Sequence, residues 1–417
     1  MSIAIPDSSP LTPALIERIA ALAAEGIDDE PISAGEDTFW NGLVDVGSEL
    51  WLDTGDIDAA NERWCSAFTA LTTNNTLLNK EIQKGIYDEF IAKTAGELAE
   101  LDEATKVMEI AFILNARHGL RLAKRFGGKV SVELHTDTAH DVEQAVFYGL
   151  RFQEICPEQF IVKVPLTPAG LIATRTLREA GVTINFTLGF SARQNYVAAA
   201  FARPNYVNVF LGRLNSYVSS HGLGPGDNVG EKACLASQRG VVTASATRDG
   251  EATRQIAASL REGTQVADLA GLDVYTLPTA VSDQAREQLD GSWQNQRESD
   301  PPVTFTPAAE GARCEVLWKI DDAVKQFAAG LNDSPPANAE ALVDAAHAAG
   351  CGDLFPRWQA GDLNQISSDG KIPVHASWKE RIAAGELAID TLLNAAGLLS
   401  FTQDQAALDE RIRNCLG

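Results

Sequence analysis

The amino-acid sequence predicts an α/β protein in which eight parallel strands, each followed by a helix, close into a (β/α)8 TIM barrel. Three observations support this prediction. Apolar runs of strand length recur through residues 50–277, segments with helical periodicity separate them, and some of the runs alternate strictly between apolar and polar residues. A chain of 417 residues is long enough for one such barrel with additions at both ends.

The first 48 residues are expected to form an N-terminal helical extension. Residues 11–26 have helical periodicity that stops at Gly26, and a second helical stretch lies near 39–48. The barrel is expected over residues 49–299. Its eight predicted strands are Leu50–Asp53, Phe68–Thr72, Val130–Leu134, Phe160–Thr167, Val182–Leu188, Tyr206–Leu211, Val241–Ala246 and Leu272–Leu277. The wide gap between the second and third strands is predicted to hold two amphipathic helices, near 79–99 and 101–124.

Residues 300–417 differ from the barrel, since prolines at 301–302 and 335–336 break the chain and the remainder is helical. We expect a helical C-terminal segment that packs on or near the barrel mouth. Residues 365–376 share part of the spacing of an EF-hand calcium loop. However, Gln365 and Ala376 occupy the places of its two strongest ligands, so we expect a plain turn and no calcium.

The charge of the chain limits its partners. Its 57 acidic and 34 basic residues give a net charge of −23, which argues against nucleic acid and against an anionic membrane surface. An anionic substrate would therefore need a local cluster of basic groups. The six cysteines form no C-x-x-C pair, and we find neither a signal peptide nor a run long enough to span a bilayer. These features favour a cytoplasmic protein with reduced thiols.

Two predicted strands, Val130–Leu134 and Val182–Leu188, alternate between apolar and polar residues. On a barrel strand the apolar set packs under the helices, so the polar set must point inward. Buried polar groups cost free energy unless they find partners. A polar layer at the carboxyl ends of the strands therefore indicates an active site. The alternative is a satisfied polar layer without chemistry.

A single lysine, Lys163, lies within the apolar run Phe160–Thr167. Burial of a lysine favours its uncharged amine, which is a nucleophile and can form a Schiff base with a carbonyl substrate. The alternative is a lysine at a strand end whose amine reaches solvent.

Other reactive side chains stand at the predicted ends of successive strands. In chain order, with Lys163, they are Asp53, Thr72, Thr73, Asn74, Glu133, Asn185, Thr187, Arg213 and Arg248. This set suits cleavage of a C–C bond beside an imine. The lysine would form the electron sink and a carboxylate would remove the hydroxyl proton. Amides would hold sugar hydroxyls, and the arginines would bind a phosphate.

The chain resembles the transaldolase family over roughly residues 48–290. The resemblance rests on six motifs in order, which are Asp53-Thr54-Gly55-Asp56, Thr72-Thr73-Asn74, Val130-Ser131-Val132-Glu133, Val162-Lys163-Val164-Pro165, Asn185-Phe186-Thr187-Leu188 and Phe210-Leu211-Gly212-Arg213. Transaldolases are class I, Schiff-base (β/α)8 enzymes of the pentose phosphate pathway. The resemblance also implies a final helix across the barrel mouth, at Ile389–Leu398 or Leu408–Cys415.

The resemblance implies a role for each site residue. Lys163 would form the Schiff base with the dihydroxyacetone unit, and Asp53 would be the general acid/base. Glu133 and Thr187 would hold the water that moves protons at the imine. The residues implied in binding the substrate are Thr72, Asn74, Ser131, Asn185, Arg213 and Arg248.

Three positions depart from the family pattern. Asn208 stands where a serine is usual, Ala246 replaces a small hydroxyl residue two places before Arg248, and Asn75 replaces a proline. Asn208 therefore joins the candidate substrate-binding residues. Because these positions touch donor or phosphate recognition, they leave the donor sugar open. Phe210, in place of tyrosine, is closer to transaldolases than to fructose 6-phosphate aldolases.

These inferences predict an enzyme that transfers a dihydroxyacetone unit from a ketose phosphate to an aldose phosphate, without metal or organic cofactor. We expect small sugar phosphates as its partners, and a monomer or homodimer. The alternatives are an aldolase that releases free dihydroxyacetone, a transaldolase for a modified sugar, and a non-enzymatic barrel that binds sugar phosphates.

Overall fold

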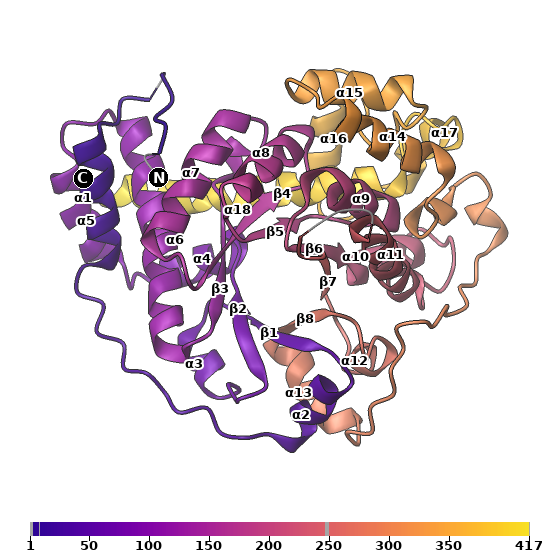
Figure 1. Cartoon of the computed structure of the whole chain (residues 1–417), viewed down its shortest axis with the longest axis horizontal. Helices are drawn as coiled ribbons and strands as arrows, with labels where there is room; N and C mark the ends of the chain where they lie inside the picture. The colour runs from indigo at the N-terminus through magenta and orange to yellow at the C-terminus, as the bar shows by residue number, and fades with distance from the viewer. Residues whose placement is uncertain (1–2, 8, 247–249, 417) are drawn as a thin grey trace.

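The computed structural model describes residues 3–7, 9–246 and 250–416. Its centre is a closed barrel of eight parallel strands that pair in chain order, with β1 also paired to β8 (Figure 1). The strands are β1 Glu49–Asp53, β2 Phe68–Thr72, β3 Lys129–Glu133, β4 Phe160–Pro165, β5 Ile184–Thr187, β6 Tyr206–Phe210, β7 Arg254–Ala258 and β8 Val274–Pro278. The predicted (β/α)8 barrel is thus confirmed.

The prediction for the seventh strand was wrong. Residues 241–245 belong to helix α11 (Val229–Ser245), and β7 begins nine residues after this helix ends. The β-branched residues Val241, Val242 and Thr243 favour a strand locally, but on α11 Val241 is buried whereas Val242 and Thr243 are exposed. Strand β7 was overlooked because it begins with Arg254 and Gln255 and ends in two alanines. Arg248, which was assigned to the end of the seventh strand, lies outside the described residues.

The register of the strands brings the polar residues of the inner face together. Glu133 of β3 lies beside Lys163 of β4, and Lys163 lies beside Asn185 of β5. In parallel strands, side chains at paired positions share one face of the sheet. The alternation read in the sequence therefore places a carboxylate, an amine and an amide next to one another inside the barrel.

Helices surround the barrel on its outer side (Figure 1). The helices of the barrel units are α3 Ile57–Asn61, α4 Asn75–Gln83, α5 Asp88–Glu97, α6 Glu103–Phe126, α7 Val142–Ile155, α8 Pro168–Glu179, α9 Ala192–Val197, α10 Leu211–Ser220, α11 Val229–Ser245, α12 Thr264–Asp268 and α13 Thr279–Gln288. Between β2 and β3 the chain forms three helices rather than the predicted two. The first of them ends before Gly85, which has a φ of +80° that favours glycine.

The N-terminal extension contains α1 (Pro13–Ala24) and α2 (Thr38–Asp45). Helix α1 packs on α6 through its buried leucine and isoleucine side chains. Helix α2 lies beside the last residues of the barrel segment in the chain. The indole N–H of Trp293 donates to the backbone oxygen of Phe39 there. The extension thus covers the outside of the barrel and lies apart from the carboxyl ends of the strands.

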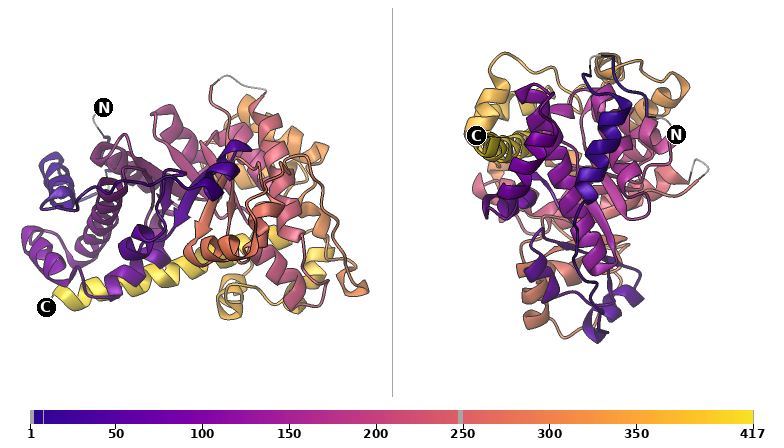
Figure 2. Two further views of the ribbon diagram at one scale, coloured as in Figure 1. Left: turned by 90° about the horizontal axis from the view of Figure 1, so that it is seen from below. Right: turned by 90° about the vertical axis from the view of Figure 1, so that its left-hand side faces the viewer.

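The C-terminal segment, residues 300–417, contains α14 (Asp322–Asp333), α15 (Ala339–Ala348), α16 (Asp362–Asp369), α17 (His375–Ala383) and α18 (Ile389–Leu416). Helices α14 to α17 form a cluster on one side of the barrel. Helix α18 is 28 residues long and runs beside the barrel from this cluster to α5 (Figure 2). The two stretches proposed as a final helix are both parts of α18. The EF-hand-like stretch is not a plain turn, because its first five residues are the end of α16.

A buried ionic network joins the C-terminal segment to the barrel. The guanidinium of Arg193, on α9, contacts Asp390 on α18 at 2.9 Å and Asp353 at 3.0 Å. Arg313 also contacts Asp353, at 3.1 Å. Arg193 is 5% exposed and Asp390 is fully buried, so neither charge has water as an alternative partner.

Replacing Arg193 with alanine is expected to destabilise the protein by about 3–5 kcal/mol, the cost of leaving a buried charge unpaired. The buried carboxylate of Asp390 would then lose its cation, and Asp353 would keep only Arg313. The free energy of unfolding in urea, followed by circular dichroism, measures this loss. Lys93→Ala, which breaks an exposed pair with Glu25, serves as the control and should change the urea midpoint little. Equal stability of the two variants would contradict the structural role of the network.

Among the described residues, no helix has the length and hydropathy that a membrane-spanning helix requires.

Candidate active site

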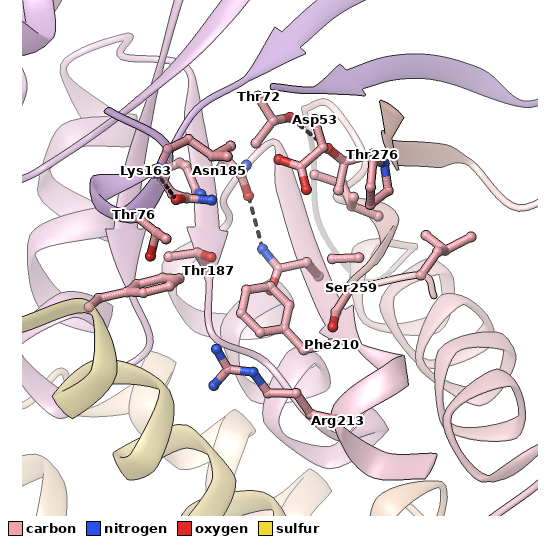
Figure 3. Close-up of a pocket in the computed structure, with 18 of the residues that line it drawn as sticks. Asp53, Thr72, Thr76, Lys163, Asn185, Thr187, Phe210, Arg213, Ser259 and Thr276 are labelled. Atoms are coloured by element: carbon pink, nitrogen blue, oxygen red, sulfur yellow. Dashed lines mark hydrogen bonds between the residues drawn. The ribbon is translucent and has the colours of Figure 1, made fainter. Parts of the chain in front are cut away.

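A cavity of ≈ 350 Å³ opens at the carboxyl ends of the strands. Figure 3 shows Lys163 and Asp53 toward one end of this cavity and Arg213 toward the other. The site residues predicted from the sequence that line it are Asp53, Thr72, Asn74, Lys163, Asn185, Thr187, Asn208 and Arg213. Of the other predicted residues, Ser131 and Glu133 lie behind the wall of the cavity, and Arg248 is not described.

The amine of Lys163 is held inside the barrel and does not reach bulk solvent. The residue is only 3% exposed. Its Nζ donates a hydrogen bond to the backbone oxygen of Thr73 at 3.1 Å and lies 3.8 Å from Oε2 of Glu133. A buried amine at the wall of a polar cavity, with a carboxylate close by, is suited to nucleophilic attack on a carbonyl.

Asp53 ends β1 and faces the same cavity. Its Oδ1 is buried and has no hydrogen-bond partner among the described residues. Burial raises the pKa of Asp53 to about 6, and the negative charge of Glu133 adds to this, although the cations Lys163 and Lys80 act in the opposite direction. A carboxylate with a pKa near neutrality and a free oxygen can exchange a proton with a bound ligand.

Glu133 is buried beside Lys163 and does not line the main cavity. Its Oε2 accepts a hydrogen bond from the backbone N–H of Asn75 at 3.1 Å. Burial raises the pKa of Glu133, whereas the charge of Lys163 and the bond from Asn75 oppose the rise. The side chain borders a separate cavity of ≈ 10 Å³, about the space that one water molecule needs.

The amides of the site form a fixed chain. Asn185 donates from Nδ2 to Ser131 Oγ at 3.2 Å and accepts at Oδ1 from Asn208 Nδ2, also at 3.2 Å. Asn208 in turn accepts from the backbone N–H of Gly189. These bonds determine which end of the Asn185 amide is the donor, so a ligand meets it in one orientation. Asn208 is thus a support for Asn185 as well as part of the cavity wall.

The hydroxyl and amide groups of β2 and β5 complete this end of the cavity. Thr72 Oγ1 accepts from Thr276 Oγ1 at 2.8 Å. Asn74 caps α4 by accepting from the N–H of Leu77. Thr187 Oγ1 is buried and without a hydrogen-bond partner among the described residues. A buried hydroxyl that the protein leaves unsatisfied indicates that a ligand or water takes its place.

The opposite end of the cavity is basic. Arg213 is 7% exposed, and its Nη1 is buried without a hydrogen-bond partner among the described residues. Burial lowers the pKa of Arg213 to about 10, and the charge of Arg261 adds to this effect, while Asp404 opposes it. An unpaired buried guanidinium is costly, and an anionic ligand would remove that cost.

A family model described as transaldolase/fructose-6-phosphate aldolase matches residues 50–333. The chain belongs to this family. A transaldolase of Xanthomonas oryzae pv. oryzae strain PXO99A is 30% identical over 297 residues, which cover 68% of this chain and 85% of that protein. A probable transaldolase of Thermus thermophilus is 35% identical over 237 residues, which cover 56% of this chain and 88% of that protein.

The loop after β7 contributes two further residues to the cavity, Ser259 and Arg261, which were not predicted from the sequence. The signal was available, because Ser259-Leu260-Arg261 has a small hydroxyl residue two places before an arginine, as expected for the family. Ser259 has a φ of +62°, a conformation that is uncommon for residues other than glycine and concentrates at functional sites.

Proposed function

We propose that the protein transfers a dihydroxyacetone unit from a ketose phosphate to an aldose phosphate through a Schiff base at Lys163. The proposal rests chiefly on one observation, the buried amine of Lys163 in a cavity that it shares with Asp53 and 3.8 Å from Glu133. Membership of the transaldolase/fructose-6-phosphate aldolase family supports it.

In the proposed first stage, the neutral amine of Lys163 adds to the ketone carbon C2, and loss of water gives an iminium ion. The ionised carboxylate of Asp53 then removes the proton from the C4 hydroxyl. The C3–C4 bond breaks, its electron pair moves to the iminium as an enamine, and the aldose product leaves.

The second stage reverses these steps with a new aldehyde. The enamine carbon C3 attacks the acceptor carbonyl carbon, and protonated Asp53 returns its proton to the new hydroxyl. Water then hydrolyses the imine and frees Lys163. We assign the proton transfers at the imine to a water near Glu133 and Thr187. The carbonyl-side hydroxyls would bind Asn74 and Asn185, and the phosphate would lie between Arg213 and Arg261.

Reduction with borohydride in the presence of fructose 6-phosphate tests the proposal. The reagent should convert the imine to a stable secondary amine, and mass spectrometry of peptides should place the added three-carbon or six-carbon unit on Lys163. Lys129 is the internal control and should stay unmodified, because it begins β3 and so lies at the end of the barrel away from the cavity. Absence of an adduct on Lys163 would contradict the proposed enzyme and favour a barrel that only binds sugar phosphates.

A second candidate is an aldolase that releases free dihydroxyacetone, because the family model covers both activities. The two differ in the fate of the enamine. Without an acceptor aldehyde, a transaldolase should release at most about one equivalent of aldose phosphate per active site. Sustained release of dihydroxyacetone under the same conditions would favour the aldolase. A panel of donors that includes modified sugars would reveal the donor that Asn208 permits.

A further inference from the structure

Three cations without carboxylate partners surround the basic end of the cavity. They are Arg213, Arg261 and Lys371, and all three line the cavity. Among the described residues, Nη1 of Arg213 is buried without a hydrogen-bond partner, and no carboxylate forms an ion pair with any of the three cations. This is unusual in a chain with 57 acidic residues, where most of the other described arginines pair with a carboxylate. Because like charges repel, such a cluster favours the binding of an anion.

Lys371 does not come from the barrel. It lies in the loop between α16 and α17 of the C-terminal segment, outside residues 50–333 that the family model matches. Phe401 of α18 lines the same cavity, so this segment forms part of its wall at two separate points. The basic end of the site therefore combines barrel residues with a cation from an added segment.

Helix α18 fixes the position of this segment over Arg213. A Cβ added at Gly397 would lie 2.8 Å from Cδ2 of Leu188 and 3.2 Å from Nη1 of Arg213, so the helix packs closely on both side chains and a larger residue would make them shift. The Asn394 amide donates to the backbone oxygens of Leu166 and Leu188, which follow β4 and β5. Asp404 of the same helix accepts a hydrogen bond from the hydroxyl of Thr76, and its negative charge raises the pKa of Arg213. The added segment is thus anchored at the active site.

We propose that Lys371 is a specificity-determining residue that binds the terminal phosphate of the substrate together with Arg213 and Arg261. With Asp404 nearby, the group carries a net charge of two positive, which matches a phosphate monoester dianion. This inference rests on the proposed function for the identity of the substrate as a phosphorylated sugar. It adds that the C-terminal segment selects for the phosphate and plays no part in bond-making.

The test compares Lys371→Ala and Lys371→Arg with Lys379→Ala. Lys379 is an exposed lysine of α17 that does not line the cavity, so its loss changes the net charge of the chain equally. The KM for fructose 6-phosphate should rise about fivefold in Lys371→Ala, the effect of an exposed ion pair, with kcat unchanged. Lys371→Arg should restore the KM, and Lys379→Ala should leave it unaltered. For unphosphorylated fructose, Lys371→Ala should behave like the wild type.

A binding measurement separates this inference from the proposed function. Titration of the whole protein with inorganic phosphate, followed by calorimetry, reports on the basic end of the cavity without any turnover. The dissociation constant should rise about fivefold in Lys371→Ala, even if no imine forms at Lys163. An equal effect of Lys371→Ala and Lys379→Ala on phosphate binding would overturn the inference. The effect would then come from the net charge of the whole chain and not from a contact with Lys371. An unchanged dissociation constant in Lys371→Ala would overturn it as well.

Discussion

Replacing Lys163 with methionine is expected to abolish turnover, with kcat lower by about 10⁴-fold or more, the range observed when an enzyme loses its nucleophile. Methionine has a similar length and no amine, so it can fill the space on β4 but cannot form an imine. The fold should persist, because the barrel strands and their apolar outer faces are untouched. Glu133 would lose its nearest cation, and burial favours its neutral form.

A coupled assay of aldose phosphate formation measures the loss, and the circular dichroism melt measures the stability. Lys129→Met is the matched control, since it makes the same change at the opposite end of a barrel strand, on an exposed residue. Turnover in Lys163→Met that stays close to the wild-type rate would contradict the Schiff-base mechanism. A lost melting transition would show that Lys163 is mainly structural, and catalysis would then have to be tested by borohydride trapping in the wild type.

The part of the site that could be predicted from the sequence is the part set by strand periodicity. Residues of β3 and β5 alternate between apolar and polar side chains, whereas β4 is apolar except for Lys163. Pairing in register follows from parallel strands of similar length. Lys163, Glu133 and Asn185 therefore lie together as expected. The same reasoning succeeds for Asp53, because β1 ends at the residue that the apolar run predicts.

The basic end of the cavity could not be predicted equally well. Strand β7 has few large apolar residues, and its Gln255 is buried because it accepts hydrogen bonds from Ser237 and Asn195. Such polar packing depends on neighbours that are distant in the chain, so a local pattern does not reveal it. Because the seventh strand was expected at residues 241–246, Arg261, which follows the observed strand and lines the cavity, was overlooked.

The contribution of the C-terminal segment was also beyond local reasoning. The sequence shows that residues 300–417 are helical and that a helix could cross the barrel mouth. It does not show that Lys371, in a loop, and Phe401, in the helix that ends the chain, line one cavity. That placement depends on tertiary contacts such as the network around Arg193, whose partners are separated by 160 and 197 residues.

Replacing Asp53 with asparagine is expected to lower kcat by about 10²- to 10⁴-fold, the usual contribution of a general base. The amide retains the size and polarity of the side chain but cannot accept the C4 hydroxyl proton. The imine should still form, because Lys163 is unchanged. Borohydride should therefore trap fructose 6-phosphate on the variant, which separates a defect in C–C cleavage from a defect in binding. Failure to trap would indicate that Asp53 acts before cleavage.

The same substitution should make the protein more stable at neutral and alkaline pH. The pKa of Asp53 is raised to about 6 from an ordinary value of 3.8, so between these pH values the folded state retains a proton that the unfolded state has lost. The free energy of unfolding contributed by Asp53 therefore decreases as the pH rises through this window. Above pH 6 the ionised buried carboxylate costs up to about 3 kcal/mol, at ~1.4 kcal/mol per pKa unit. Asparagine avoids this cost.

Urea unfolding at several pH values measures the effect. Asp53→Asn and the wild type should be almost equally stable near pH 4, and the variant should become more stable as the pH rises to about 7. Asp45→Asn, on the exposed surface of α2, is the matched control for removing one carboxylate. In the wild type, kcat/KM for donor cleavage should rise through about pH 6, because cleavage needs the ionised form. Coincidence of these two transitions would assign both to Asp53, whereas a pH-independent stability difference would contradict the raised pKa.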